Sequence, residues 1–148
     1  EDIHCSGVTI ECRINAENPE RNFQPNPGKI EQIFAPGGLG VRFDTHVHSG
    51  YMVPSHYDSM IGKLIVRGPD RDATLEGARQ ALGSLGVEGV KTTIPYYLEV
   101  LKVPTFRSAH FHTGFVEEHP ELVNYRTSRP TRELAAVIAA SLAAHAGY

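Results

Sequence analysis

A two-residue alternation near the start of the chain constrains its fold more than any other feature. Within residues 7–16 one set of side chains is apolar and the set between them is polar. The apolar set is Val8, Ile10, Cys12 and Ile14, and the polar set is Thr9, Glu11, Arg13 and Asn15. This period of two predicts a β-strand with one buried and one open face. The open face presents a carboxylate, a guanidinium and an amide in a row, which together can hold and polarise a flat polar ligand.

The rest of the first two-thirds of the chain predicts further short strands. We expect them at 29–34, 41–44, 45–48 and 61–67, with Ile30, Gln32 and Phe34 on one face of the second strand. Pro-rich and Gly-rich turns should separate the strands at 17–28 and 35–40.

Two helices should follow the strands. The first begins at Asp70 or Asp72 and runs to about Leu85, because apolar residues recur there at helical spacing. The second runs over 93–102, with Pro95 in its first turn, and Leu98 and Leu101 should face inward. Short elements cover 104–118. This order predicts an α+β fold, a mainly antiparallel sheet with helices packed on it, and not a doubly wound sheet.

Composition excludes several classes of function. The 148 residues have a net charge of −3, which gives no electrostatic case for binding nucleic acid. No apolar run approaches the roughly 20 residues that span a bilayer, and we expect no signal peptide. Cys5 and Cys12 match no disulfide or metal pattern, so Cys12 should be a small core residue and the protein should be cytoplasmic. Since the first residue is Glu1, we expect a piece of a longer protein.

Five ordered motifs carry a specific resemblance. They are Glu-Cys-Arg-Ile-Asn-Ala-Glu-Asn-Pro at 11–19, Pro-Asn-Pro-Gly-Lys-Ile at 25–30, Ala-Pro-Gly-Gly-Leu-Gly-Val-Arg at 35–42, Tyr-Asp-Ser-Met-Ile-Gly-Lys-Leu at 57–64 and Gly-Val-Lys-Thr-Thr at 89–93. Together they resemble the C-terminal domain of biotin carboxylase, the ATP-using component of biotin-dependent carboxylases. The resemblance runs from about Val8 to Glu118.

The resemblance implies a domain division and an activity. Residues 1–122 would form the biotin carboxylase C-terminal domain, and 123–148 a linker and a C-terminal helix at about 131–145. The parent enzyme would be a ligase that uses ATP, Mg²⁺ and bicarbonate to carboxylate biotin on a carrier protein. The ATP-grasp lysines, the Mg-binding carboxylates and the glutamate base of that family fall outside these motifs. We therefore expect this chain alone to be inactive and to bind none of these cofactors.

Arg13 is the main catalytic candidate, and two interpretations compete for it. From the strand pattern alone, an exposed Arg is a surface ion-pair member, for which Glu11 and Asn15 are the neighbours on the same face. The resemblance instead implies that Arg13 lies beside the ureido ring of biotin and stabilises the oxyanion that forms there. Glu11 and Asn15 would then support it.

Asp58 and Tyr57 are the next candidates. The simplest interpretation of Asp58 is a turn residue that precedes a strand. The resemblance implies that the Tyr-Asp-Ser segment lines the biotin-side cleft, where Asp58 would help to hold the site. It also implies that residues 113–115 approach the adenine of ATP.

The glycine-rich loop at 37–40 and the histidines each have a chemical alternative. The loop lacks the Lys-Ser/Thr of a phosphate-binding loop, so we expect a turn between strands. The resemblance places Leu39 and Arg42 at a homodimer interface. The pairs His46/His48 and His110/His112 should be exposed on strand faces, and without convincing further ligands we expect no metal site.

The resemblance also implies partners, and it leaves alternatives open. The partners would be the remainder of the biotin carboxylase chain, a biotin carboxyl carrier protein or domain, and a carboxyltransferase subunit. The acyl acceptor of the parent could be acetyl-CoA, as in fatty acid biosynthesis, propionyl-CoA or pyruvate. A second hypothesis is a non-catalytic module that binds a carboxylase partner or biotin carrier.

Overall fold

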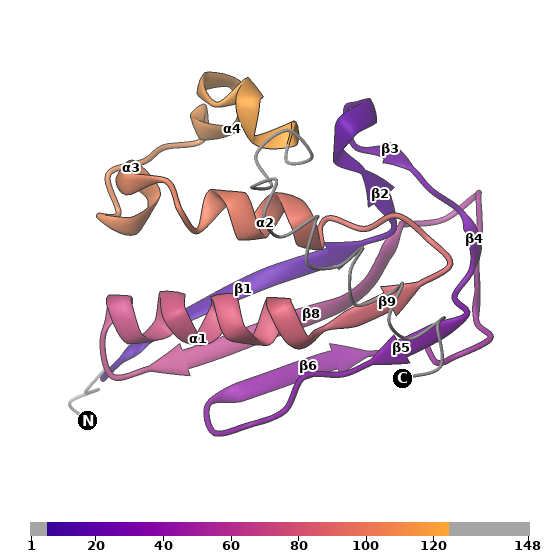
Figure 1. The fold of residues 1–148 in the computed structure, drawn as a ribbon, viewed down its shortest axis with the longest axis horizontal. Coiled ribbons are helices and arrows are strands. Elements are labelled where there is room, and N and C mark those ends of the chain that lie inside the picture. Colours follow the sequence, from indigo (N-terminus) through magenta and orange to yellow (C-terminus); the bar gives the residue numbers. More distant parts are fainter. Residues whose placement is uncertain (1–5, 125–148) are drawn as a thin grey trace, which may run out of the picture.

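The structure is a computed structural model that describes residues 6–124. A three-stranded antiparallel sheet forms its centre, and helices α1 and α2 run along one side of it (Figure 1). This arrangement confirms the predicted α+β class. The predicted helix at 131–145 and Cys5 lie outside the described residues.

The central sheet has the order β1–β8–β6, with bounds Val8–Asn15, Met60–Gly68 and Val41–Thr45. The antiparallel register places Arg13 opposite Lys63 and Glu11 opposite Ile65. The register shifts between Ile14 and Asn15, where β1 ends. The predicted alternation is confirmed, because Cys12 and Ile14 are buried while Glu11 and Arg13 are exposed.

Three two-stranded ladders flank the central sheet. They pair β2 (Glu17–Asn18) with β3 (Gln24–Pro25), β4 (Gly28–Lys29) with β7 (Met52–Val53), and β5 (Gln32–Phe34) with β9 (Gly86–Glu88).

The predicted single strand at 29–34 is wrong, because the chain changes partners in its middle. The Ile30 amide donates to the Tyr51 carbonyl at 2.8 Å, whereas the Glu31 amide donates to the Glu88 carbonyl at 2.8 Å. Ile30 is fully buried, but Gln32 and Phe34 are exposed, so the three do not share a face. Burial of Ile30 separates β4 from β5.

The predicted strand at 45–48 is also wrong. The strand β6 ends at Thr45, whose hydroxyl donates to the Ile61 carbonyl and accepts from the Val47 amide at 3.2 Å. A side chain that bonds the backbone two residues ahead turns the chain out of the ladder.

The helix α1 (Arg71–Ser84) confirms the predicted first helix. Asp70 accepts from the Ala73 amide at 2.8 Å, which is a helix N-cap. The expected stripe of Leu75, Ala78, Leu82 and Leu85 is buried against β8 and β1.

Shorter helices complete the described chain. They are α2 (Ile94–Val100), α3 (Pro104–Arg107), α4 (Phe115–Glu118) and the 3-10 turns η1 (Pro19–Arg21) and η2 (Pro120–Val123). The predicted second helix is confirmed with Pro95 in its first turn, Leu101 buried and Leu98 packed against the main core.

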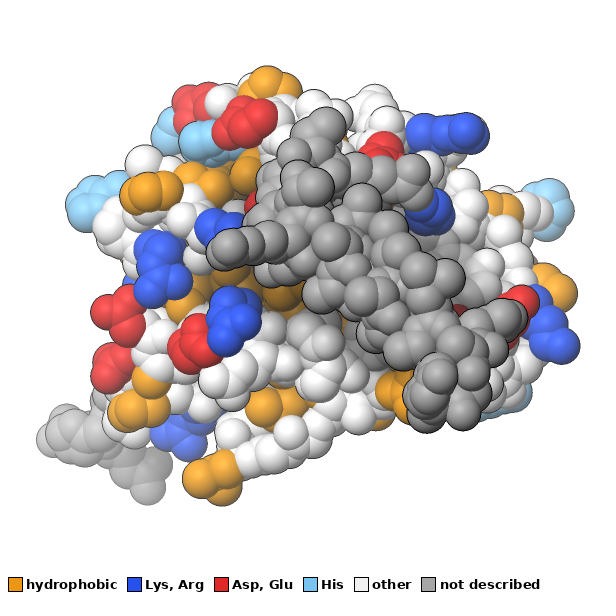
Figure 2. All heavy atoms as spheres, viewed as in Figure 1, with side chains coloured by type: hydrophobic (Ala, Val, Ile, Leu, Met, Phe, Trp, Pro, Cys, Tyr) orange, Lys and Arg blue, Asp and Glu red, His pale blue; other side chains and the backbone are white. Residues whose placement is uncertain are grey.

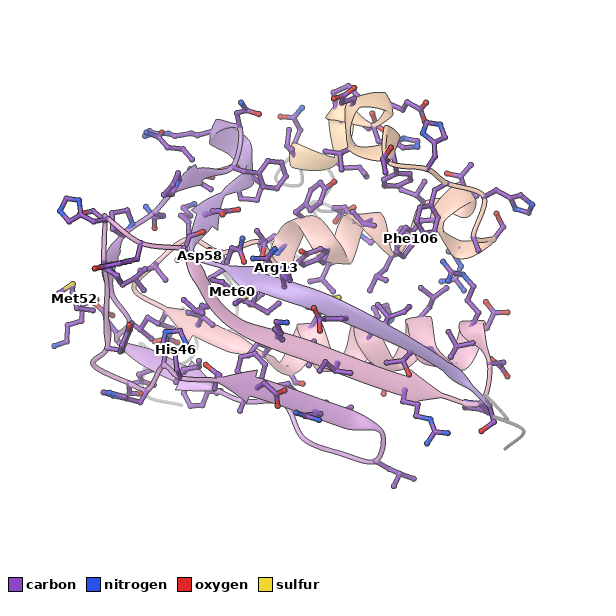
Figure 3. All side chains as sticks on the ribbon, turned by 180° about the vertical axis from the view of Figure 1, so that it is seen from behind. Arg13, His46, Met52, Asp58, Met60 and Phe106 are labelled. Atoms are coloured by element: carbon purple, nitrogen blue, oxygen red, sulfur yellow. The ribbon has the colours of Figure 1, made fainter. Side chains whose placement is uncertain are left out.

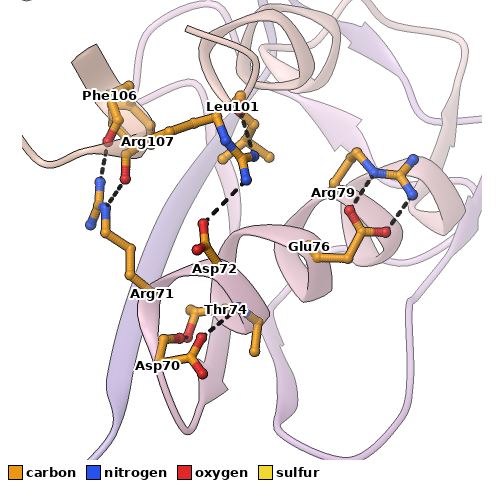
Figure 4. Close-up of polar contacts among 10 residues, drawn as sticks. Asp70, Arg71, Asp72, Thr74, Glu76, Arg79, Leu101, Phe106 and Arg107 are labelled. Atoms are coloured by element: carbon orange, nitrogen blue, oxygen red, sulfur yellow. Dashed lines mark hydrogen bonds and ion pairs between the residues drawn. The ribbon is translucent and has the colours of Figure 1, made fainter. Parts of the chain in front are cut away.

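Polar contacts tie α1 to α3. The Arg71 guanidinium donates to the carbonyls of Phe106 and Arg107, and Arg107 pairs with Asp72 at 3.2 Å (Figure 4). On the face shown in Figure 2, basic and acidic side chains lie close together near these helices and do not form a patch of one sign.

Two apolar clusters lie on opposite sides of α2. The larger fills the space between the sheet and α1 and contains Ile14, Ile30, Leu64 and Leu82. The smaller consists of Tyr96, Val100, Phe115 and Leu122. Partly buried Tyr97 and Phe106 pack against both clusters, so α2 joins the sheet to the segment that follows it.

Gly89 provides a test of the turn that leads into α2. Its φ is +98°, and a Cβ there would collide with the Lys29 carbonyl oxygen and come within 2.9 Å of the Glu31 amide nitrogen. Gly89→Ala should therefore lower the free energy of unfolding by about 2 kcal/mol or more. Gly83→Ala is the matched control, because Gly83 lies in α1 with no heavy atom near its Cβ position, and it should stabilise by up to about 1 kcal/mol. Urea unfolding of both variants measures the difference, and equal effects would contradict the proposed strain.

Candidate functional site

The candidate site begins at the open face of β1, where Arg13 projects beside Asp58. The Arg13 Nη2 donates to the Asp58 Oδ2 at 3.5 Å, and the two side chains are 54% and 63% exposed (Figure 3). The ion pair joins segments 45 residues apart. Because both groups are hydrated, the pair contributes at most about 1 kcal/mol to stability.

The expected pairing of Arg13 with its strand neighbours is wrong. Glu11 instead lies 3.6 Å from the Lys63 ammonium on β8. Asn15 donates its amide to the Glu17 carboxylate at 2.9 Å and lies past the register shift of β1. Glu11 therefore pairs with a residue of the neighbouring strand, and Asn15 pairs with a residue that follows β1. Neither pairs with Arg13 as the alternation had suggested.

Asp58 occupies a turn directly before β8. Its Oδ1 accepts from the Met60 amide at 3.0 Å, which confirms the interpretation as a turn residue. Its second oxygen faces Arg13, so the turn also places a carboxylate beside the guanidinium.

Glu17 and Ser59 hold the Asp58 segment against the end of β1. The Glu17 carboxylate accepts from both the Ser59 hydroxyl and the side-chain amide of Asn15. The backbone amide of Ala16 donates to the Ser59 carbonyl at 2.7 Å. Sequence reasoning missed both residues, although each lies inside one of the five sequence motifs. The sequence did contain a signal, because Glu17 shares a motif with Arg13 and Ser59 directly follows Asp58 in another motif.

Thr93 and Tyr97 were missed as well. Both donate to the carbonyl oxygen of Arg13, at 3.2 Å and 3.0 Å. Nothing in their spacing links them to Arg13, which lies about 80 residues earlier.

A hollow of about 350 Å³ adjoins Asp58. It is lined by His46, Tyr51, Val53, Pro54, Tyr57, Asp58, Met60 and Ile61. Tyr57 is 83% exposed, so its ring is open to solvent beside the Arg13–Asp58 pair. The structure thus brings Arg13, Asp58 and Tyr57 into one region, with Glu11 on the neighbouring part of the sheet.

Leu39 and Arg42 lie in a different region. The loop between β5 and β6 projects from the lower edge in Figure 1, and Leu39 within it is fully exposed. Arg42 makes a bidentate contact with Asp44 at 2.8 Å and 2.7 Å, and this hydrogen bonding lowers the pKa of the Asp44 carboxyl. No helix follows the glycine-rich loop, which confirms a turn between strands.

The four histidines are exposed as expected, but the expectation that they lie on strand faces is wrong. His46 and His48 follow β6, and both rings lie nearly perpendicular to the Tyr51 ring. His110 and His112 lie between α3 and α4. Across residues 6–124, no three His, Cys, Asp or Glu side chains gather as a metal site would require. Of residues 113–115, Phe115 is buried in the smaller cluster.

The sequence around this site matches a known protein family. A sequence model of the biotin carboxylase C-terminal domain matches residues 11–118. The chain belongs to the biotin carboxylase C-terminal domain family. Biotin carboxylase 1 of Bacillus subtilis is 48% identical over 119 residues, which is 80% of this chain and 26% of that protein.

Other relatives agree with this assignment. The 2-oxoglutarate carboxylase small subunit of Hydrogenobacter thermophilus is 41% identical over 147 residues, 99% of this chain and 31% of that protein. A crystal structure of its biotin carboxylase domain dimer with MgADP, ADP and bicarbonate has a TM-score of 0.80 at 42% identity, covering 82% of this chain and 27% of that one. The biotin carboxylase subunit of a pyruvate carboxylase has a TM-score of 0.78 at 44% identity, covering 80% and 26%.

The chain is much shorter than the relatives that it matches. This chain spans between about a quarter and a third of the length of the relatives. Within the described part of the chain, no helix is long and apolar enough to cross a membrane.

Cys12 offers a test of the buried side of the site strand. Burial raises the pKa of the Cys12 thiol to about 11, and its contribution to stability should be lost as the pH rises from about 9 towards 11. Since the thiolate is the reactive form, a Cys5→Ser variant should react with a thiol reagent at pH 8 at least about 100-fold more slowly when folded than in urea. Equal rates would show that Cys12 does not belong to the core.

Proposed function

We propose that this chain is part of a biotin carboxylase, in which it forms the wall of the active site that faces biotin. The single observation that carries this proposal is Arg13, a half-exposed guanidinium on a rigid strand with one carboxylate partner among the described residues. Family membership supports the proposed substrate class, which is biotin on a carrier protein, with ATP and bicarbonate as co-substrates and Mg²⁺ as the metal cofactor.

The chemistry of Arg13 fits the carboxylation of biotin. Removal of a proton from the ureido ring leaves negative charge on its oxygen. A guanidinium is charged at any working pH and donates through a planar fork, so it stabilises this oxyanion more than the neutral urea. Such differential binding lowers the barrier, and loss of one donor typically costs about 10²–10³ in rate.

Asp58 is a supporting group in this proposal, not a proton-transfer group. It balances the charge of Arg13 when no substrate is present. Tyr57, exposed beside the adjoining hollow, would line the biotin-side cleft, while Glu11 and Asn15 support the strand.

The domain limits are part of the same proposal. We propose a domain over residues 1–122. Burial of Leu122 in the smaller cluster supports its C-terminal limit, four residues past the end of the family match. Residues 123–148 would form the linker and helix, and the match to the Hydrogenobacter small subunit extends into this segment.

Partners follow from the family. We propose that the rest of a biotin carboxylase chain supplies the ATP-grasp residues, that a biotin carrier and a carboxyltransferase complete the enzyme in the cytoplasm, and that this chain alone is inactive. Two relatives are named as individual subunits of larger carboxylases, which favours a carrier on a separate chain. These two relatives are named for different substrates, 2-oxoglutarate and pyruvate.

Arg13→Ala in the full-length protein that contains this sequence tests the catalytic role. The kcat for biotin carboxylation should fall by about 10²–10³, with the affinity for ATP unchanged, because the guanidinium acts on the biotin oxyanion. Arg79→Ala is the matched control, since Arg79 has the same charge and 55% exposure but pairs with Glu76 on α1. Activity of Arg13→Ala equal to that of Arg79→Ala would refute the assignment and favour a non-catalytic module.

Leu39 tests the proposed dimer surface, which also includes Arg42. A relative crystallises as a biotin carboxylase domain dimer, and Leu39 is a fully exposed apolar side chain at a loop tip. Leu39→Asp should weaken self-association at least tenfold, measured by light scattering across a dilution series. Val116→Asp, which alters an exposed apolar residue on α4, should have no such effect. An unchanged dimer in Leu39→Asp would place the interface elsewhere.

A further inference from the structure

The backbone of Arg13 is held by side chains of α2. The strand β1 lies at one edge of the central sheet, so one of its sides has no strand partner there. At its end, the Arg13 carbonyl accepts from the Thr93 hydroxyl at 3.2 Å and from the Tyr97 hydroxyl at 3.0 Å. The backbone amide of Asn15 donates to the Thr93 hydroxyl at 3.1 Å, and the backbone amide of Thr93 donates to the backbone carbonyl of Asn15 at 3.1 Å.

The Thr93 hydroxyl bonds to β1 and does not cap the helix α2. It occupies the N-cap position of α2, where a hydroxyl ordinarily accepts from the first-turn amides. Here the side chain makes no capping bond, is buried, and bridges two residues of β1.

Tyr97 follows Thr93 by one helical turn and approaches the same carbonyl. Burial raises the pKa of Tyr97 to about 12, so the hydroxyl remains a donor at working pH. Two donors on one carbonyl fix the peptide that follows Arg13 from the side of the strand away from β8.

This rigidity compensates for the weak hold on the tip of the side chain. The guanidinium of Arg13 is restrained by one exposed ion pair, which cannot fix its position strongly. A catalytic donor must lie within about 0.5 Å of its productive geometry. The precision therefore has to come from the backbone.

We propose that Thr93 and Tyr97 are positioning residues for Arg13, which set where its guanidinium meets the developing oxyanion of biotin. The inference rests on the proposed function of Arg13 and extends it to two residues of α2. Neither residue touches the substrate in this proposal, because both act through the Arg13 carbonyl.

Thr93→Val and Tyr97→Phe in the full-length protein test the inference. Each removes one hydroxyl at nearly constant volume. Since a misplacement of about 1 Å can cost 10²-fold in rate, we expect each partial release to lower kcat for biotin carboxylation roughly 10-fold. The KM for ATP should stay within twofold, and Thr93→Ser, which restores the hydroxyl, should recover kcat to within about twofold.

Tyr96→Phe is the matched control. The Tyr96 hydroxyl lies in the same helix, is buried, and has no hydrogen-bond partner among the described residues. Its removal should leave kcat unchanged. A purely structural role would instead lower kcat and ATP affinity together, in parallel with a loss of folded protein. If Thr93→Val does not fold, Tyr97→Phe decides, because Thr93 continues to hold the carbonyl in that variant.

Two outcomes separate the inference from the proposal beneath it. If Arg13→Ala loses biotin carboxylation but Tyr97→Phe and folded Thr93→Val keep their kcat within twofold, the positioning inference is overturned and the role of Arg13 survives. If Arg13→Ala itself keeps its activity, the proposed function fails and the inference fails with it.

Discussion

The antiparallel register of β1 with β8 determines where the candidate side chains of β1 lie, Arg13 among them. Since side chains alternate along a strand, a slip by one residue would bury Arg13 and expose Ile14. Two features fix the register. Ile14, opposite Gly62, is fully buried and places the apolar side of β1 in the core. The shift after Ile14 then ends the ladder and turns Asn15 towards Glu17.

The charges on the open face of this sheet pair locally and weakly. Glu11 faces Lys63, Arg13 faces Asp58 and Arg42 faces Asp44, and all of these side chains remain substantially exposed. Exposed pairs of this kind contribute little to folding. Under the proposed function, the pair with Asp58 would balance the charge of Arg13 until a ligand binds, and the backbone would place the guanidinium.

Periodicity predicted the elements that bury one continuous face. The strands β1 and β8 and the helices α1 and α2 were all foreseen, because each packs a regular apolar stripe against the main core. It failed at 29–34 and 45–48, where Ile30 switches partners and Thr45 bonds the backbone ahead of it. Both events depend on groups elsewhere in the chain, which a short window of sequence does not contain.

The residues of the candidate site were likewise predicted only in part. Arg13 was found because it stands on a regular strand, and its proximity to Asp58 was suggested only by the family resemblance. Glu17, Ser59, Thr93 and Tyr97 were missed because their bonds join residues separated by up to 84 positions and leave no periodic trace.

The position of α2 connects the segment that follows it to the strand that carries Arg13. One side of α2 bonds β1 through Thr93 and Tyr97, and its other side packs Tyr96 and Val100 against Phe115 and Leu122. Arg71 in turn bonds to the carbonyls of Phe106 and Arg107, which joins α1 directly to α3. A helix of seven residues cannot be stable alone. The smaller cluster therefore does more than close the domain: by holding α2 in place, it holds the carbonyl of Arg13.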